Sequence, residues 1–370
     1  MNIPLKLVAA NDTVGALIAL GDALAGRNAV FITAPEVNGK MPEAHGLPDQ
    51  VDQSIALIVE SSGSTGTPKR ITISRAALLA SAQAADTVLG GPGQWLLALP
   101  INYIAGSNVL VRALVADQQP VMMNNQLPFT PDAFARAADF MTGARRYVSL
   151  VPVQLQRLVN AAELDQFLLA KMRRFDAILV GGQAADPKLI AKATQLGLKL
   201  IRSYGSAETA GGCVYDGLPL PGVAVRIADS GVVQIAGPTL AESVADAEGW
   251  YSTNDLGHLD PNGRLRVTGR ANRVIISGGL KVSLDAIETA VREIGGVVEV
   301  AAIAVSDTEW GERAALVYVG SPEVADYIAA DALQHLGPAA KPVRVIRVDS
   351  IPRLASGKPD YVALTAQFAS

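Results

Sequence analysis

The sequence predicts an α/β protein with a large N-terminal domain, built of mostly parallel sheets flanked by helices, and a small α+β domain after it. The first observation is that strand-like and helical runs alternate between residues 55 and about 203. The second is that prolines and glycines separate short strands from about 218 to 268, which predicts a twisted antiparallel region. The third is that 370 residues, 49% of them hydrophobic, suffice for one large and one small domain.

Local signals predict the elements of the alternating region. Leu17, Leu20 and Leu24 fit one face of an N-terminal helix. Buried strands are predicted at residues 55–59, 95–99, 120–123, 147–151 and 175–180. Helices are predicted near 74–88, 131–142 and 186–196, the last two opened by Thr130-Pro131 and Asp186-Pro187.

The last hundred residues predict the small domain. A helix face is formed by Ile287, Ala290, Val291 and Ile294, with Ser283 as its cap. Strands are predicted at residues 297–305, 314–319 and 343–348. The boundary is placed in the segment 269–272, which gives domains of residues 1–271 and 272–370.

Composition excludes several classes of protein. The net charge of −4, without a basic cluster, argues against nucleic acid as the main ligand. The single cysteine, Cys213, excludes an internal disulfide framework and is expected to be a small buried residue. The apolar region 14–33 is interrupted by Asp22, Arg27 and Asn28, so no membrane span is expected. We therefore expect a cytoplasmic protein.

A loop rich in serine, threonine and glycine carries the strongest functional signal. Glycines leave backbone N–H groups open, hydroxyls add donors and a lysine adds positive charge, so such a loop suits a polyphosphate. Lys69 comes three residues after Gly66, which differs from the Gly-Lys-Ser/Thr order of the P-loop NTPases. The alternative is a flexible surface linker. The loop reads Ser61-Ser62-Gly63-Ser64-Thr65-Gly66-Thr67-Pro68-Lys69.

Two further loops are expected to lie near it. Gly181-Gly182 follows one predicted strand, and Tyr204-Gly205 follows the apolar run 198–201. In parallel α/β sheets, ligands bind beyond the carboxyl ends of the strands. All three loops are therefore expected to converge on one edge of the sheet.

Five segments, taken in order and spacing, resemble the adenylate-forming superfamily of acyl-CoA synthetases, adenylation domains and luciferases. The resemblance covers nearly the whole chain from residue 55 onward. It implies a mobile C-terminal domain and an enzyme that uses ATP, Mg²⁺ and coenzyme A to activate a carboxylic acid as an acyl-adenylate. The segments are residues 61–69, Tyr204-Gly205-Ser206-Ala207-Glu208-Thr209, Trp250-Tyr251-Ser252-Thr253-Asn254-Asp255, Gly269-Arg270-Ala271-Asn272-Arg273 and Pro352-Arg353-Leu354-Ala355-Ser356-Gly357-Lys358.

The resemblance also implies roles for single residues. Lys358 is expected to bridge the substrate carboxylate and the α-phosphate, Glu208 to bind magnesium and Asp255 to accept both ribose hydroxyls. The alternatives are a surface lysine, a capping glutamate and a turn aspartate. The other nucleotide contacts implied are Tyr204 stacked on adenine, Gly181, Gly182 and Gln183 as the opposite wall, and Arg270 at the ribose or phosphate.

Relatives rotate the small domain between adenylation and thioester formation. Asn272 stands at the hinge position, and Gly278, Gly279 and Lys281 are expected to line the channel for coenzyme A. Three positions depart from the family pattern. Ala207 replaces a threonine that reaches the α-phosphate, Asn254 replaces a glycine beside Asp255, and Tyr103 replaces a frequent histidine. Asn254 is expected to tolerate a left-handed backbone.

The N-terminal part ahead of residue 61 is short, which resembles the compact bacterial o-succinylbenzoate–CoA ligases of menaquinone synthesis. The segments 149–158 and 208–217 resemble theirs as well. That substrate carries a second carboxylate which must be held without reacting. Its expected contacts are Asn102, Ser149, Arg202 and Ser206, with Tyr103 on the aromatic ring.

Alternative functions stay open. One is a CoA ligase for another aryl or medium-chain acid, and another is an adenylation domain that feeds a carrier protein. A third is a catalytically idle nucleotide-binding protein, supported only by Ala207, Asn254 and Asn272. A homodimer is plausible for this family, although no segment of the sequence marks an interface.

Overall fold

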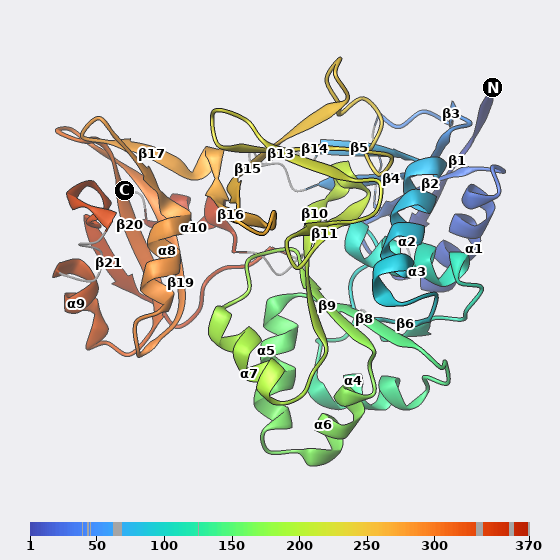
Figure 1. Ribbon diagram of the computed structural model, residues 1–370, viewed down its shortest axis with the longest axis horizontal. Helices are drawn as coiled ribbons and strands as arrows, with labels where there is room; N and C mark the ends of the chain where they lie inside the picture. The colour runs from blue at the N-terminus through green and yellow to red at the C-terminus, as the bar shows by residue number, and fades with distance from the viewer. Residues whose placement is uncertain are drawn as a thin grey trace. The chain divides into compact units, whose positions relative to one another are not determined.

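The structure is a computed structural model that describes residues 1–38, 40–42, 44, 46–61, 69–124, 126–330, 336–354 and 359–368 (Figure 1). The chain divides into two compact units. The first comprises Met1–Val225 with Ile235–Tyr251, and the second comprises Arg226–Gln234 with Ser252–Ser370. The domain boundary after residue 271 stays a prediction.

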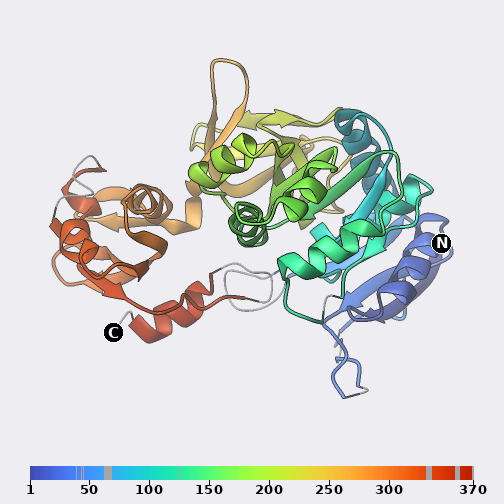
Figure 2. The same ribbon diagram turned by 90° about the horizontal axis from the view of Figure 1, so that it is seen from below.

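A five-stranded sheet opens the first unit, in the order β3-β1-β2-β4-β5. Strands β1, β2 and β4 are parallel, whereas β3 and β5 run antiparallel to β1 and β4. Helix α1 packs along β1 and β2 through Ala16, Leu20 and Ala23 (Figure 2). Of the predicted face, Leu20 is buried, whereas Leu17 and Leu24 are only partly buried. The bounds are β1 Asn2–Ala9, α1 Thr13–Leu24, β2 Ala29–Thr33, β3 Gln50–Asp52, β4 Ile55–Ser61 and β5 Lys69–Ser74.

A seven-stranded sheet forms the rest of the first unit, in the order β12-β11-β10-β9-β8-β6-β7. The strands from β7 to β10 are parallel, and β11 and β12 add an antiparallel edge. The strand bounds are β6 Gln94–Leu97, β7 Val121–Met122, β8 Arg146–Leu150, β9 Ala177–Gly181, β10 Leu200–Ser206, β11 Gly211–Tyr215 and β12 Leu218–Pro219.

Helices cover both faces of this sheet (Figure 1). One face packs on α4 to α7 through Phe134, Leu155 and Leu189, and the other packs on α2 and α3 through Leu78 and Leu110. Caps predicted from the sequence are confirmed: Thr130 and Asp186 accept backbone hydrogen bonds, and proline follows each. The bounds are α2 Arg75–Leu89, α3 Ile104–Val115, α4 Pro131–Asp139, α5 Pro152–Ala162, α6 Gln166–Arg173 and α7 Pro187–Gln195.

The predicted antiparallel region is a four-stranded sheet in the order β13-β14-β15-β16, most of which lies in the second unit. Most glycines and prolines of this region lie between its strands, whereas Pro219 lies in β12 and Gly257 lies in β15. The bounds are β13 Ala224–Ile227, β14 Val232–Ala236, β15 Trp250–Leu259 and β16 Leu265–Arg270.

The C-terminal part of the second unit is the α+β arrangement that the sequence predicts. Helix α8 packs on β19 and β20 through the buried Ile287 and Val291, and Ser283 caps it by accepting from Ala286 N. Strands follow the order β18-β17-β20-β19, with β21 paired to β20. The bounds are β17 Val274–Ser277, β18 Leu280–Ser283, α8 Leu284–Arg292, β19 Val297–Asp307, β20 Gly311–Gly320, α9 Val324–Ala330, β21 Arg344–Arg347 and α10 Tyr361–Phe368.

Two expectations about the loops were wrong. The Ser/Gly loop follows β4, which belongs to the five-stranded sheet, so it does not share a sheet edge with the loop after β9. Tyr204 and Gly205 lie within β10 rather than after it, because this strand continues to Ser206 where it pairs with β11. The sheet that β4 joins and the residue at which β10 ends both depend on pairing with strands that are distant in the sequence. Local sequence patterns do not predict such pairing.

Candidate active site

The carboxyl edge of the seven-stranded sheet gathers most of the predicted site residues of the first unit. The parallel strands β6, β8, β9 and β10 all end at this edge, which is where ligands bind in open α/β sheets. The predicted residues that lie in or directly after these strand ends are Asn102, Tyr103, Ser149, Gly181, Gly182, Gln183, Tyr204, Gly205, Ser206 and Glu208.

Glycine is required at three of these positions. A Cβ on Gly181 would lie 2.7 Å from the carbonyl oxygen of Ser203, so the side chain is absent where β9 meets β10. Gly182 has φ of +84°, a conformation that other residues rarely adopt. A Cβ on Gly205 would lie 2.1 Å from the carbonyl oxygen of Gly211. The backbone segments of this edge are therefore packed so closely that a side chain at Gly181 or Gly205 would collide with a neighbouring carbonyl.

Glu208 lies in the single turn η1 (Ala207–Thr209) that follows β10. Thr209 fixes this turn, because its hydroxyl accepts from Ser206 N at 2.9 Å and donates to the carbonyl of Gly211 at 2.7 Å. The Glu208 side chain is half-buried, and no residue in the described ranges makes a hydrogen bond or ion pair with its carboxylate. A carboxylate held in this way can bind a hard cation.

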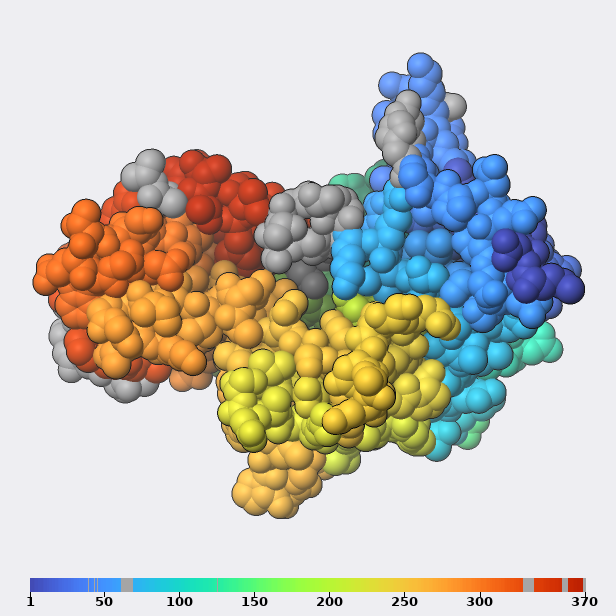
Figure 3. Space-filling view, turned by 90° about the horizontal axis from the view of Figure 1, so that it is seen from above, coloured from blue at the N-terminus to red at the C-terminus, as the bar shows by residue number. Residues whose placement is uncertain are grey.

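Two consecutive backbone N–H groups join this turn to the other sheet. Ala241 N donates to the carbonyl of Glu208 at 2.8 Å, and Glu242 N donates to the carbonyl of Thr72 in β5 at 2.9 Å. In the space-filling view the yellow residues of this segment lie against the light-blue residues of β5 (Figure 3). Glu208 is thereby placed beside the strand that begins at Lys69, directly after the Ser/Gly loop.

A strained residue follows Glu208 and was not foreseen from the sequence. Ala210 is fully buried with φ of 48° and ψ of 38°, in the left-handed region that alanine rarely adopts. Its carbonyl accepts from Ser81 Oγ at 3.0 Å and from Asn108 Nδ2 at 2.7 Å. Both donors are buried polar side chains on otherwise apolar faces of α2 and α3, which is the signal that could have marked them.

Two departures from the family pattern now have a structural context. Ala207 is 8% exposed and packs in the apolar core of the first unit, so a small residue fits this position. Asn254 lies in β15 and is not among the residues with positive φ. Asn254 therefore does not need to adopt a left-handed backbone, and asparagine meets no strain there.

Asp255 and Arg270 lie in the second unit and pair with each other. They are opposite residues of β15 and β16, and Arg270 Nε lies 3.3 Å from Asp255 Oδ1. The backbone N–H of Asp255 donates to Thr253 Oγ1 at 3.0 Å. The arginine side chain is half-exposed, at 51%, so a ligand can reach it.

The residues predicted to contact the acid differ in how buried they are and in whether they already have a partner. Tyr103 is half-buried at the start of α3, and burial raises the pKa of its hydroxyl. Arg202 is exposed and paired with Asp216, with 3.1 Å between Nε and Oδ1. Gln154, in the segment 149–158, is a buried residue whose amide donates to the carbonyl of Ala98 at 2.8 Å, so its contacts are those of a packing residue.

Several predicted residues lie outside the described ranges. These are Lys358 and residues 62–68 of the Ser/Gly loop, and the Ser61 side chain is not described either. The base of each segment is described. Ser61 and Lys69 are paired residues of β4 and β5, and Asp360 N donates to the carbonyl of Pro352 at 2.8 Å.

The predicted hinge and coenzyme A residues are exposed. Asn272 lies in the short turn η2 (Ala271–Arg273), and Gly278-Gly279 is the two-residue turn between β17 and β18. Their φ values of +56° and +80° are those of a type I′ turn, which requires glycine or asparagine. A Cβ on Gly278 would lie 2.6 Å from the Trp310 ring, so local packing already explains this glycine.

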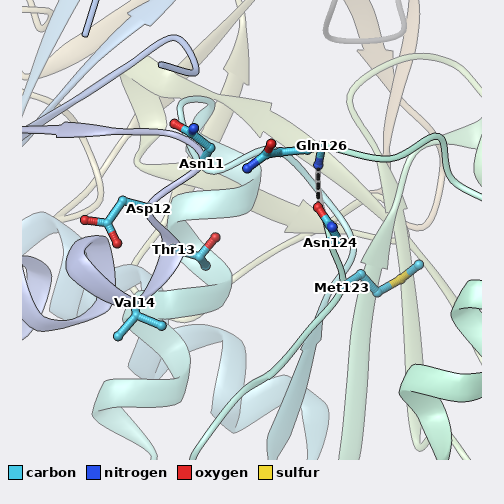
Figure 4. A pocket seen from close by; sticks show the side chains of 7 residues that line it. All are labelled: Asn11, Asp12, Thr13, Val14, Met123, Asn124 and Gln126. Atoms are coloured by element: carbon cyan, nitrogen blue, oxygen red, sulfur yellow. Dashed lines mark hydrogen bonds between the residues drawn. The ribbon is translucent and has the colours of Figure 1, made fainter. Parts of the chain in front are cut away.

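A separate pocket of about 270 Å³ contains none of the predicted residues (Figure 4). Asp12 caps the start of α1 there by accepting from Gly15 N at 2.8 Å. Its carboxylate occupies the helix end that an anion would need. The lining residues are Asn11, Asp12, Thr13, Val14, Met123, Asn124 and Gln126.

Two general expectations can be compared with the structure. Cys213 is fully buried, which confirms the prediction of a small core residue, and burial raises the pKa of its thiol to about 11. Among the helices within the described residues, none is both long and apolar enough to span a membrane.

Comparison with known families gives two matches. Residues 10–239 match the family described as AMP-binding enzyme, and residues 286–358 match the AMP-binding enzyme C-terminal domain. A Mycobacterium tuberculosis protein named "Probable 2-succinylbenzoate–CoA ligase" is 36% identical over 99% of this chain and 98% of its own length. The 2-succinylbenzoate–CoA ligase of Escherichia coli is 30% identical over 68% of this chain and 56% of its own.

Solved structures share the fold. The o-succinylbenzoate CoA synthetase of Bacillus subtilis, in complex with its acyl-adenylate intermediate, has a TM-score of 0.74 and 22% identity, covering 97% of this chain and 82% of that one. The amide bond synthetase of Marinactinospora thermotolerans has a TM-score of 0.78 and 23% identity, covering 100% and 90%. At these identities the likeness concerns the fold alone.

Proposed function

Because this chain belongs to the AMP-binding enzyme family, we propose that it is an ATP-dependent acid–CoA ligase and that its acid is o-succinylbenzoate. The observation that carries the proposal is the likeness to the mycobacterial protein of that name, which extends over nearly the full length of both chains. The product would be o-succinylbenzoyl-CoA, an intermediate of menaquinone synthesis.

The reaction has two halves. In the first, an oxygen of the aliphatic carboxylate attacks the α-phosphorus of ATP. The bond from this phosphorus to the oxygen that bridges to the β-phosphate breaks, and pyrophosphate leaves with its electron pair. In the second, the sulfur of coenzyme A attacks the acyl carbonyl, AMP leaves, and the thiol proton passes to solvent. Two anions meet in the first half, so positive charge and fixed donors should dominate catalysis. Lys358 is proposed to supply that charge.

Glu208 is proposed as the protein ligand of Mg²⁺. The described residues hold no cluster of three or more histidine, cysteine, aspartate or glutamate side chains suited to a metal. Magnesium is typically bound by one or two carboxylates together with waters and substrate phosphates. The carboxylate of Glu208, which is half-buried and has no partner among the described residues, fits that arrangement. The ion, when bound, would neutralise charge on the phosphates of ATP.

Contacts with the nucleotide are proposed for several residues. Tyr204 and the Gly181-Gly182-Gln183 wall would hold adenine at the edge of the seven-stranded sheet. Asp255 would accept the ribose hydroxyls, and its partner Arg270 would hold the carboxylate in position for them. The Ser/Gly loop and Lys69 are proposed to hold the β- and γ-phosphates.

The acid is proposed to bind near Tyr103 and Ser149, with Asn102 and Ser206 as further donors. Arg202 would neutralise the aromatic carboxylate, although Asp216 already shares its charge. Asn272 is proposed as the hinge, and Gly278, Gly279 and Lys281 as the channel for coenzyme A. A cytoplasmic location and a homodimer are also proposed, the first supported by the free thiol of Cys213.

Exchange of labelled pyrophosphate into ATP tests the first half-reaction. The purified chain should catalyse exchange that depends on both o-succinylbenzoate and Mg²⁺. Exchange with benzoate or medium-chain acids alone would keep the chemistry and overturn the proposed acid. No exchange with any acid would favour an idle nucleotide-binding protein.

A further inference from the structure

A buried carboxylate lies at the centre of a polar cluster in the second unit. The side chain of Glu288, on α8, is only 3% exposed. Its oxygens accept from Arg273 Nη2 at 2.5 Å, Ala302 N at 2.9 Å and the Tyr361 hydroxyl at 3.0 Å. A buried charge of this kind is tolerated only when donors surround it, so the cluster fixes its members in one geometry.

Arg273 connects the cluster to the proposed hinge. It directly follows Asn272 in η2, and its Nε lies 2.5 Å from Asp285 Oδ1 at the start of α8. The other oxygen of Asp285 accepts the backbone N–H of Arg270 at 2.7 Å. The segment 270–273 is therefore held by the first two turns of α8.

Tyr361 connects the cluster to the segment that carries Lys358. It is the first residue of α10 and follows Lys358 by three positions. Its ring lies under the guanidinium of Arg273, 3.8 Å from Cζ to the ring centroid. Burial raises the pKa of Tyr361, so the hydroxyl keeps its proton and is the donor to Glu288.

The base of the lysine segment is fixed on its other side as well. Arg353 and Pro359 form an isolated bridge, and Arg353 Nη2 lies 2.8 Å from Glu299 Oε1 on β19. The described residues on the two sides of positions 355–358 are thus held from two directions, Arg353 through Glu299 and Tyr361 through Glu288.

We propose that Arg273, Glu288 and Tyr361 are positioning residues that join the hinge segment to the lysine segment, so that the two move as one body during the domain rotation. The inference rests on the proposed function, because it concerns where Lys358 is held for adenylation. The cluster is not assigned any contact with a substrate. Its loss should impair the half-reaction that uses Lys358 and spare the half-reaction that does not.

Arg292 provides a matched control. It also contacts Glu288, with 2.7 Å from Nη2 to Oε2, but it lies four residues later on the same helix. Its link therefore begins and ends within α8 and reaches neither the hinge nor the lysine segment. If the cluster had a purely structural role, loss of Arg292 and loss of the Tyr361 hydroxyl would change the rates of the two half-reactions to the same extent.

The test compares Tyr361→Phe with Arg292→Gln in the full chain. Adenylation is measured as pyrophosphate release in a single turnover, and thioester formation is measured with supplied o-succinylbenzoyl-adenylate and coenzyme A. Tyr361→Phe should slow adenylation at least tenfold and change thioester formation less than twofold. Arg292→Gln should leave both within about threefold. Equal slowing of the two half-reactions by Tyr361→Phe would overturn the proposal.

Arg273→Lys extends the test if Tyr361→Phe lowers thermal stability. The amine keeps the charge but loses the second donor, and the double variant should slow adenylation no more than the worse single variant. If the slowing of adenylation in the double variant equalled the product of the two single effects, the two residues would act independently. That result would contradict the proposal that they act through one connected cluster. A wild-type protein that catalyses neither half-reaction would contradict the proposed function itself. Failure of the proposed function can therefore be distinguished from failure of the positioning role.

Discussion

Asn108 Nδ2 donates a hydrogen bond of 2.7 Å to the carbonyl of Ala210, a buried residue in the left-handed region two positions after Glu208. Such a conformation costs on the order of 1–2 kcal/mol for a non-glycine residue. Because 102 positions separate the partners, the bond ties α3 to the turn that presents Glu208. The strain is thus held in place by packing and hydrogen bonds of the first unit.

Asn108→Ala should lower the free energy of unfolding by about 1–3 kcal/mol, since it leaves the strained carbonyl with Ser81 as its partner and opens a small cavity. Urea unfolding measures the change. Asn160→Ala is the control, because Asn160 lies exposed on a helix and should change stability by less than about 0.5 kcal/mol. Equal effects of the two substitutions would contradict this role for Asn108.

Glu208→Gln should raise the Mg²⁺ concentration needed for half-maximal pyrophosphate release at least tenfold, because the amide removes the charge that attracts the ion. The melting temperature should stay within about 2 °C, since the described residues offer the carboxylate no partner to lose. Glu163→Gln, on the surface, should leave the Mg²⁺ requirement unchanged. An unaltered requirement in Glu208→Gln would remove Glu208 from the metal site.

Lys358→Ala should reduce adenylation by at least a hundredfold and spare the transfer of a supplied adenylate to coenzyme A. The physical reason is that charge at the α-phosphate matters only while two anions approach each other. Single-turnover assays of each half-reaction measure the two effects. Similar losses in both would argue against the role assigned to this lysine.

Arg202→Ala should raise the Michaelis constant for o-succinylbenzoate about tenfold, if the guanidinium neutralises the aromatic carboxylate. Asp216→Asn is the control, because it removes the partner of Arg202 without removing the positive charge. It should leave that constant unchanged or lower it. If Arg202→Ala had the wild-type Michaelis constant for o-succinylbenzoate, Arg202 would not bind the acid and its role would be limited to the ion pair with Asp216.

Cys213 should make stability fall as pH rises from about 9 to 11. Its pKa is raised to about 11 by burial, so in this window the folded thiol keeps a proton that the unfolded thiol loses. The stabilising contribution is complete below pH 9 and declines above it, by roughly 3 kcal/mol in total. Urea unfolding of the wild type and Cys213→Ala across this range should give a steeper decline in the wild type. Parallel curves would contradict the assigned shift.

Local signals in the sequence were sufficient for some of the helices and strands, whereas α3, α5, α6, α9 and α10 were not predicted. The starts of α4 and α7 were predicted because Thr130-Pro131 and Asp186-Pro187 act within one turn of the chain. The sheet to which β4 belongs was not predicted, because its partners β2 and β5 are chosen by tertiary packing. Sequence patterns therefore indicated the elements better than their arrangement.

The same distinction applies to the site. Residues in short motifs, such as Glu208 and Asp255, could be proposed for the site because their motifs resemble those of the family. The residues that hold them could not, because the Asn108 contact spans 102 positions and the Tyr361 contact with Glu288 spans 73. Such pairs carry no local pattern and become visible only when the folded chain brings them together.

The most direct test of the account is to incubate the purified chain with ATP, Mg²⁺ and coenzyme A, together with one acid at a time, and to identify the thioester formed. The acids are o-succinylbenzoate, benzoate and a medium-chain fatty acid. The account predicts o-succinylbenzoyl-CoA and AMP in equal amounts, and little thioester from the other acids. A thioester formed from another acid in preference, or none at all, would contradict it.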